Sequence, residues 1–365
     1  MNDLLNRVNK KIRESRPMMP DDQLFNLWQS KKESQLFIKS KGCRYSRGGS
    51  CTMCDYGVSE RNLTLHETAV ALKNLLMRMR KDTRRIVLGS YGSFFDPDEI
   101  PVENRNYILK MLSRVDVEQI TIETHYETME EDVLRDAAEQ LRDKFLSYEV
   151  GLESTDTYVQ EMCLNKIIDL KKLEEKIKLV HSYGNEIWLN ILFGTPFLNP
   201  KERQTDTLET IRWAFEHGAD GVILFPINIK PFTLLEELYK NGLYTPVSQW
   251  DFIELLNQIP EERLGRVTIS WYGNRVETYD NYEFKPVLPS SCKTCRDAIM
   301  EFYEIFECSD STEEKKAQLE SIRKRDFSCH CRENARKKFE TDTVSREKNV
   351  ERAYSYLRTV LEDVL

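Results

Sequence analysis

Three cysteines in the first sixth of the chain restrict its fold and chemistry more than any other feature. Cys43, Cys51 and Cys54 form a C-x7-C-x2-C array that follows a short run with strand character, residues 36–38. Thiolates are ligands of iron–sulfur clusters, so three of them can hold three irons of a [4Fe–4S] cluster. The remaining iron then keeps an open position at which a substrate can bind. The alternatives are a zinc site or three unrelated buried thiols.

Length and composition restrict the class of protein. A chain of 365 residues allows one large domain and a small one, or two to three average domains. The net charge of −8 argues against a chain that binds nucleic acid without a partner protein. We expect no membrane span and no signal peptide, because no apolar run is long enough. Nine cysteines without an export signal then indicate metal or redox chemistry in the reducing cytoplasm.

Short apolar runs alternate with longer amphipathic ones along most of the chain. This alternation predicts an α/β fold with a parallel sheet, a partial (β/α)6-type barrel whose function lies at the carboxyl ends of its strands. The predicted strands are residues 36–38, 85–89, 119–122, 148–152, 187–193 and 221–225, and residues 266–271 are a candidate for a seventh. The predicted helices are residues 2–15, 65–80, 104–114, 131–141, 170–183 and 204–216.

The alternation of predicted strands and helices starts after the first helix and stops near residue 281. We therefore expect an N-terminal helical segment over residues 1–34 and a core barrel over residues 35–285. Residues 286–365 are expected to form a small, cysteine-rich helical domain.

Polar residues gather directly after the predicted strands. Each could be ordinary turn chemistry on its own. Because parallel strands end at the same edge of a sheet, we expect these residues to meet at one mouth together with the cysteine loop. They are Gly89, Ser90, Gly92, Ser93, Glu123, His125, Tyr126, Glu127, Glu153, Ser154, Asn190, Asn228 and Lys230.

The cysteine array resembles the cluster loop of radical S-adenosylmethionine (SAM) enzymes, although their commonest spacing is C-x3-C-x2-C. The resemblance implies that the open iron chelates SAM and that an electron, from a donor of ferredoxin or flavodoxin type, splits it. It also suggests contacts to the cluster or SAM. The residues expected to bind this cofactor are Met53, Tyr56, Gly89, Ser90, Gly92, Ser93, Glu123, Glu153, Ser154, Asn190 and Asn228.

Further motifs resemble the archaeosine-biosynthesis radical SAM family, which is related to the Elongator/MiaB/NifB-type group. They are GSFFD at residues 92–96, VGLES at 150–154, NK at 165–166, TPFL at 195–198 and PIN at 226–228. The resemblance covers about residues 35–335. It implies action on a lysine adduct of a 7-deazaguanine base in tRNA, with cleavage of a C–N bond, beside a partner transferase that supplies RNA binding.

Two departures from the family pattern lie at the predicted mouth of the barrel and concern the substrate. The segment at residues 123–127 reads ETHYE, where the family commonly has ESRPE, and Ile167 replaces a glycine after Asn-Lys. We expect the catalytic residues to be His125, Tyr126, Glu127 and Lys230, acting on a polar, anionic substrate. A small metabolite is the alternative to tRNA, including transfer of a 3-amino-3-carboxypropyl group from SAM. The enzyme would be a transferase or a lyase, and a non-catalytic zinc-stapled adaptor is the remaining alternative.

A second cysteine group lies near the C-terminus. Cys292, Cys295, Cys329 and Cys331 predict a four-thiolate site, for which zinc is the default ion and an auxiliary iron–sulfur cluster or no metal the alternatives. His330 could replace one flanking thiolate. Cys163 and Cys308 are expected to be ordinary buried thiols. Residues 321–340 carry seven basic and three acidic side chains, which indicates either a solvated helix or a surface for RNA phosphates or an acidic partner.

Overall fold

One curved sheet forms the centre of the protein. The computed structural model describes residues 2–18, 20–30, 33–56, 59–270 and 286–362. In that part of the chain the sheet has eight strands in consecutive order, of which β1 is antiparallel to β2 and the others are parallel. The strands are β1 Phe25–Gln29, β2 Glu33–Ile38, β3 Arg85–Ser90, β4 Gln119–Thr124, β5 Phe145–Glu153, β6 Glu186–Phe193, β7 Gly221–Pro226 and β8 Val267–Ile269. The predicted α/β partial barrel is confirmed.

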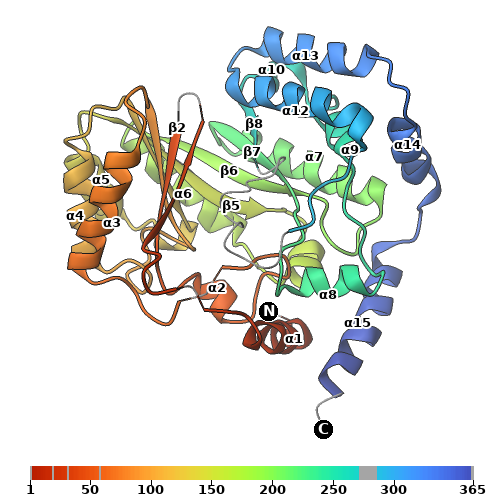
Figure 1. Ribbon diagram of the computed structural model, residues 1–365, viewed down its shortest axis with the longest axis horizontal. Coiled ribbons are helices and arrows are strands. Elements are labelled where there is room, and N and C mark those ends of the chain that lie inside the picture. The colour runs from red at the N-terminus through yellow and green to blue at the C-terminus, as the bar shows by residue number, and fades with distance from the viewer. Residues whose placement is uncertain (1, 19, 31–32, 57–58, 271–285, 363–365) are drawn as a thin grey trace.

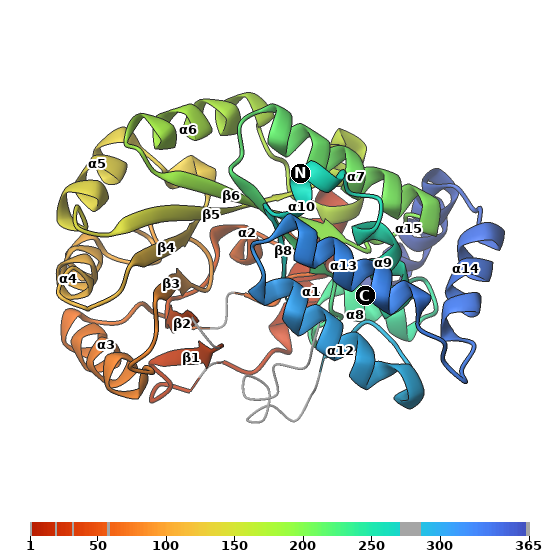
Figure 2. The same cartoon turned by 90° about the horizontal axis from the view of Figure 1, so that it is seen from above.

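A row of helices covers the outer face of the sheet. Figure 2 shows them along an arc, with the strands on its inner side. They connect successive parallel strands, as expected of βα units. The helices are α3 Leu65–Arg78, α4 Val102–Leu112, α5 Glu131–Gln140, α6 Leu170–Ser182 and α7 Pro200–Glu216.

The alternation of residues along each strand separates an apolar face from a polar one. On β4, Ile120 and Ile122 are fully buried in the main core, packed with residues of the covering helices. Since successive side chains point to opposite faces, Thr121 and Glu123 lie on the inner face. Asn190 on β6 also lies on the inner face, because its chain neighbours Leu189 and Ile191 are both buried in the main core. The inner face therefore combines a rigid support with polar groups, which suits a ligand site.

The antiparallel strand β1 was not predicted from the sequence. Its five residues are half-buried or exposed and show no alternation in burial. Trp28 packs edge-on against Phe37 of β2, with 4.8 Å between the ring centres. β1 is thus held by pairing with β2, by this aromatic contact and by the packing of Phe25 and Leu27 against the main core, none of which a periodicity search detects. Residues 1–34 accordingly contain a strand in addition to the expected helix.

The two ends of the chain pack together. The helix α1, Asp3–Glu14, lies against the last helix, α15, Arg346–Glu362, near the bottom of Figure 1. Leu5 and Val8 of α1 share a second hydrophobic cluster with Val350 and Leu357 of α15. This cluster gives the barrel a second core, separate from the one between sheet and helices.

The C-terminal third adds helices around the later strands. They are α8 Leu234–Lys240, α9 Gln249–Leu256, α10 Glu261–Leu264, α12 Lys293–Cys308, α13 Thr312–Lys324 and α14 Cys331–Thr341. Trp271, the predicted end of the last strand, lies outside the described residues. Within the described chain, every helix is too short or too polar to pass through a lipid bilayer.

Candidate functional site

The three-cysteine loop follows β2, at the carboxyl ends of the parallel strands. Cys43 immediately precedes the short helix α2, Arg44–Arg47, and Cys51 and Cys54 follow it. Cys43 and Cys51 are buried and Cys54 is half-buried. Burial raises the pKa of Cys43 to about 12 and places the pKa of Cys51 well above its ordinary value. These thiols therefore need a strongly positive partner, such as a metal, to become thiolates.

One arginine of the N-terminal helix holds this loop. The guanidinium of Arg13 donates to the backbone carbonyl of Ser46 through Nη1. Its Nη2 donates to the carbonyls of Ser50, Cys51 and Cys54, at 3.0, 2.9 and 2.9 Å. Asn9, one helical turn earlier, donates to the carbonyl of Gly49 at 2.9 Å. The path of the cysteine loop is thus fixed by hydrogen bonds from α1, which no local sequence signal predicted.

Strained backbone gathers at the same place. Cys51, Glu153 and Asn165 all adopt positive φ angles, at 59°, 65° and 54°, although none is glycine. The amide of Cys51 donates to the carbonyl of Asn165 at 3.4 Å, directly after the π-helical turn η2, Val159–Leu164. Residues held in this region cost about 1–3 kcal/mol each and concentrate at functional sites. Three of them around one loop support this location as the site.

A buried ion pair borders the loop. Lys166 lies 2.8 Å from Glu153 through Nζ and Oε1, and its ammonium is 5.7 Å from the centre of the Tyr45 ring. Burial alone would lower the pKa of Lys166, but Glu153 and the nearby thiol of Cys51 raise it, and the net pKa is above its ordinary value. A permanent positive charge beside the cysteines favours their thiolate forms.

The segment after β3 closes against Cys43. A Cβ added to Gly92 would lie 2.3 Å from the Glu99 carboxylate and 2.7 Å from Cys43 Cα, so only glycine fits there. Glu99 accepts from the Ser93 amide at 3.0 Å, and burial raises the pKa of Glu99 to about 7. Ser90 is buried, with its hydroxyl 3.5 Å from Glu99.

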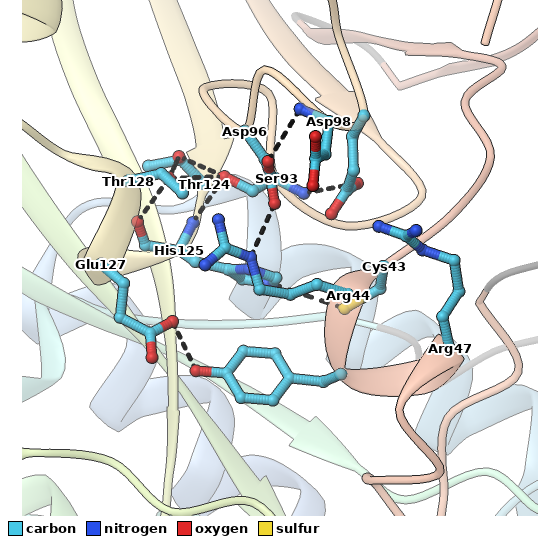
Figure 3. A network of polar contacts seen from close by, with 12 residues as sticks. Cys43, Arg44, Arg47, Ser93, Asp96, Asp98, Thr124, His125, Glu127 and Thr128 are labelled. Atoms are coloured by element: carbon cyan, nitrogen blue, oxygen red, sulfur yellow. Dashed lines mark hydrogen bonds and ion pairs between the residues drawn. The ribbon is translucent and has the colours of Figure 1, made fainter.

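His125, after β4, lies directly against the loop. Its Nε2 is 3.8 Å from Cys43 Sγ (Figure 3). Its ring packs edge-on against Tyr45, with 5.1 Å between the ring centres. Ligand atoms of Cys43, Glu99 and His125 all lie within 4.8 Å of one another. Burial, helped by Lys166 and Arg44, lowers the pKa of His125 to about 3, so its ring is neutral. Its Nδ1 is buried and has no hydrogen-bond partner among the described residues.

Several predicted site residues use their polar atoms to support the fold. The hydroxyl of Ser93 bonds to Thr124 and Thr128 and accepts from the His125 amide at 3.1 Å (Figure 3). Tyr126, in the 3-10 turn η1, Tyr126–Thr128, is buried and accepts from the Asp169 amide at 3.1 Å.

Ser154 is also a supporting residue in this structure. Its hydroxyl is completely buried, donates to Asp206 on α7 at 2.5 Å and accepts from the amide of Asp156 at 3.2 Å. Glu127 instead accepts from the hydroxyl of Tyr45, close to the loop. The roles of Ser93, Tyr126 and Ser154 are therefore best described as positioning neighbouring segments.

The inner face of the sheet presents the remaining predicted contacts. Asn190 has a buried amide oxygen without a hydrogen-bond partner among the described residues. Buried polar atoms are almost always satisfied, so such an atom indicates a missing partner such as a ligand. A Cβ added to Gly89 would lie 2.7 Å from the Glu123 carboxylate. Because glycine has no Cβ, the Glu123 carboxylate can lie close to β3 at this position. Asn228, after β7, is buried.

Lys230 is already paired. Its Nζ lies 2.9 Å from Asp55 of the cysteine loop and 4.8 Å from the centre of the Tyr56 ring. Asp55 also lies 3.7 Å from Arg16 of α1. The predicted ion pair between Lys230 and a substrate carboxylate would have to compete with Asp55. The ring of Tyr56 packs edge-on against that of Tyr91. Met53 is half-buried and packs against the hydrophobic cluster that α1 and α15 share.

The four C-terminal cysteines converge. The sulfurs of Cys292, Cys295, Cys329 and Cys331 all lie within 4.8 Å of one another, and the first two are 3.8 Å apart. A tetrahedral ion with metal–sulfur bonds of about 2.3 Å separates its sulfurs by about 3.8 Å. In a [4Fe–4S] cluster each thiolate binds a different iron, so the sulfurs stand farther apart. The spacing therefore fits one ion.

The alternative ligand His330 and the two remaining cysteines lie outside this second group. His330 pairs with Glu333 at 2.7 Å, its side chain is 84% exposed, and it is outside the group. Cys163 is buried, as expected. The prediction for Cys308 was wrong, because its residue is exposed at the end of α12.

The chain is similar in sequence to curated archaeal proteins. It is 26% identical over 247 residues to an uncharacterized protein of Methanocaldococcus jannaschii, covering 65% of this chain and 67% of that protein. It is 26% identical over 231 residues to archaeosine synthase subunit beta of Methanosarcina acetivorans, covering 62% and 66%. The match thus spans about two thirds of these relatives' length, and it confirms the resemblance predicted from the motifs.

The chain was also compared with family models and with solved structures. No family model matches the chain. Methylornithine synthase (PylB) has a TM-score of 0.48 and 16% identity, with 87% of this chain and 91% of that chain covered.

Proposed function

We propose that this protein is a radical SAM enzyme, in which Cys43, Cys51 and Cys54 hold a [4Fe–4S] cluster. The observation that carries the proposal is the placement of three thiols in one loop held by Arg13, beside His125, whose Nδ1 has no hydrogen-bond partner among the described residues. When bound, the cluster and SAM would supply an organic radical after one-electron reduction by a donor of ferredoxin or flavodoxin type.

The surrounding residues fit such a ligand. The buried oxygen of Asn190 and Nδ1 of His125 lack partners in the described structure, so both can accept hydrogen bonds from amine or hydroxyl groups. A Cβ on Gly151 would lie 2.6 Å from Glu153 and 2.9 Å from Lys166, so glycine leaves room for that ion pair. Glu153 would orient the cofactor, and Lys166 would favour the thiolates by its charge.

The substrate we propose is a modified 7-deazaguanine base in tRNA. This rests on the resemblance to proteins named archaeosine synthase subunit beta, a name that also implies a partner subunit. His125 and Glu127 border the cysteine loop and would contact the reacting part of the base. The net charge of −8 favours a small metabolite as the second candidate, including transfer of a 3-amino-3-carboxypropyl group.

We further propose that Cys292, Cys295, Cys329 and Cys331 bind one zinc ion. The 3.8 Å sulfur separation supports this, because it matches the edge of a zinc tetrahedron. The ion would hold α12 and α14 together and so stabilise residues 286–365 as a small domain beside the core barrel of residues 35–285.

Anaerobic turnover tests the cluster chemistry. Protein reconstituted with iron and sulfide is incubated with SAM and dithionite, and 5′-deoxyadenosine is measured by mass spectrometry. The triple replacement of Cys43, Cys51 and Cys54 by Ala should abolish both the cluster absorbance and SAM cleavage. Cys308→Ala is the matched control, since this exposed thiol lies outside both cysteine groups. A triple variant that still cleaves SAM would refute the assignment.

Salt dependence distinguishes the two substrate classes. Binding of tRNA should weaken steeply as salt rises, because phosphates release counterions when cationic groups replace them. A metabolite should show a shallow dependence. If no tRNA binding is measurable at low salt with the partner subunit present, the tRNA assignment is excluded and the metabolite is retained.

A further inference from the structure

A cavity away from the cysteine loop lies between α7, α9 and α14. Its volume is about 780 Å³, within the range of small-molecule and cofactor sites. α14 lies at the rim of the molecule, outside α7 and α9 (Figures 1 and 2). None of the residues of α14 is buried, so the helix covers the cavity without filling it. Its first residue, Cys331, belongs to the four-cysteine group, which fixes one end of the helix.

The cavity has a positive lining in an acidic protein. Five basic and three acidic residues line it. Glu254 is shared by two of the arginines, at 3.5 Å from Arg323 and 3.3 Å from Arg332. The guanidinium of Arg332 also lies over the ring of Trp250, with 5.5 Å to the ring centre. These contacts place flat cationic groups beside apolar side chains, which is an arrangement that accommodates nucleobases.

Two further cations of the lining have no carboxylate in contact. Arg203 is 7% exposed and donates Nε to the carbonyl of Thr195 and Nη1 to the carbonyl of Thr245. Among the described residues, neither Arg203 nor Lys338 forms an ion pair. Burial and the charge of Arg203 lower the pKa of Lys338, although the carboxylate of Asp251 opposes this. The charge of the half-buried Asp251 carboxylate acts on both cations, so two cations share one anionic group, and a phosphate between them would neutralise the remaining positive charge.

The surface outside the cavity continues the positive charge. On α14, the exposed Arg336 of the lining is followed by the exposed Lys337 outside the cavity, and among the described residues Arg336 forms a long ion pair with Glu340, at 3.9 Å. Inside, Arg203 holds the carbonyl of Thr195, which follows β6 at the same edge of the sheet as the cysteine loop. The cavity therefore joins a basic outer helix to the edge that carries the proposed site.

We propose that this cavity binds a nucleotide unit of a single-stranded RNA segment, with its phosphate between Arg203 and Lys338 and its base against the apolar wall. This deepens the proposed function, since it names where an RNA substrate is held apart from the reacting centre. RNA binding in the cavity needs no radical chemistry, so the proposed activity and the proposed RNA site are tested by different assays. A protein that does not cleave SAM can still bind RNA in the cavity, and a protein that does not bind RNA there can still cleave SAM.

Fluorescence polarisation with a labelled 12-nucleotide RNA tests the proposal on anaerobically purified full-length protein. Lys338→Gln should weaken binding about tenfold, as expected for one charge-assisted hydrogen bond. Lys337→Gln is the matched control, because it removes the same charge from the next residue, which does not line the cavity. It should change affinity less than about twofold. Equal losses in both variants would show a general surface effect and overturn the proposal.

Ala335→Trp provides an independent test, because it fills the cavity and leaves every charge in place. The proposal requires that this variant loses RNA binding, whereas undiminished binding overturns it. Competition by unlabelled AMP identifies the source of the ligand. AMP that competes as well as the RNA assigns the site to a free nucleotide, and AMP that competes at least tenfold more weakly assigns it to the RNA chain. No binding of either ligand at 50 mM salt overturns the proposal.

Discussion

Replacing Arg13 by Gln should release iron from the proposed cluster. Arg13 reaches four backbone carbonyls of the cysteine loop, three of them through Nη2. Because Nη2 carries only two hydrogens, one of these bonds is shared, and three independent bonds remain. At about 1.5 kcal/mol for each bond to a charged group, the closed form of the loop loses about 4.5 kcal/mol, or roughly two-thousandfold in its population.

The assay compares iron release in variants of one helix. Anaerobically reconstituted protein is mixed with a colorimetric iron chelator, and iron loss is followed with time. Arg13→Gln should release iron at least tenfold faster than the unaltered protein. It should also shift the reduction potential to more negative values, since a positive charge near the cluster is lost. Arg7→Gln is the control, because Arg7 lies on the same helix with an exposed side chain. Equal release rates in both variants would show that α1 does not hold the loop.

Three further outcomes are expected. Cys329→Ser should lose zinc, measured by elemental analysis, while its iron content stays constant, and Cys308→Ser should keep both metals. Asp206→Asn should be more stable than the unaltered protein at pH 8 and equal at pH 4 in urea unfolding. Burial raises the pKa of Asp206 from 3.8 to about 7, so its carboxyl stabilises the fold when protonated and this contribution is lost as pH rises between these values. Gly92→Ala should reduce cluster content by at least half, because the added Cβ would lie 2.7 Å from Cys43 Cα.

Local periodicity was sufficient to predict most of the sheet. On β4 and β6, the runs of buried isoleucine and leucine mark strands whose bounds differ from the prediction by at most two residues. β1 escaped prediction because its stability comes from pairing with β2 rather than from its own pattern. Spacing alone was also enough to group Cys292 with Cys295, since cysteines with only two residues between them must lie close in space.

Residue roles at the mouth could be predicted less well. Sequence places Ser93 and Ser154 directly after strands, but it does not show that Thr124 and Asp206 take up their hydroxyls. Arg13 was missed for the same reason, because its partners lie more than thirty residues away. Long-range hydrogen bonds decide whether a polar side chain faces a ligand or the protein.

The packing of the first helix against the last has a consequence for the order of assembly. Asn2 donates to the hydroxyl of Tyr354 at 2.9 Å, across 352 residues of chain. Contacts of such separation form late in folding, after the elements between them. Arg13 lies on that same helix, so the cysteine loop acquires its final shape only once the C-terminal helix is available. Delivery of the cluster would then follow synthesis of the whole chain, and shortening α15 would produce a folded barrel that is poor in iron.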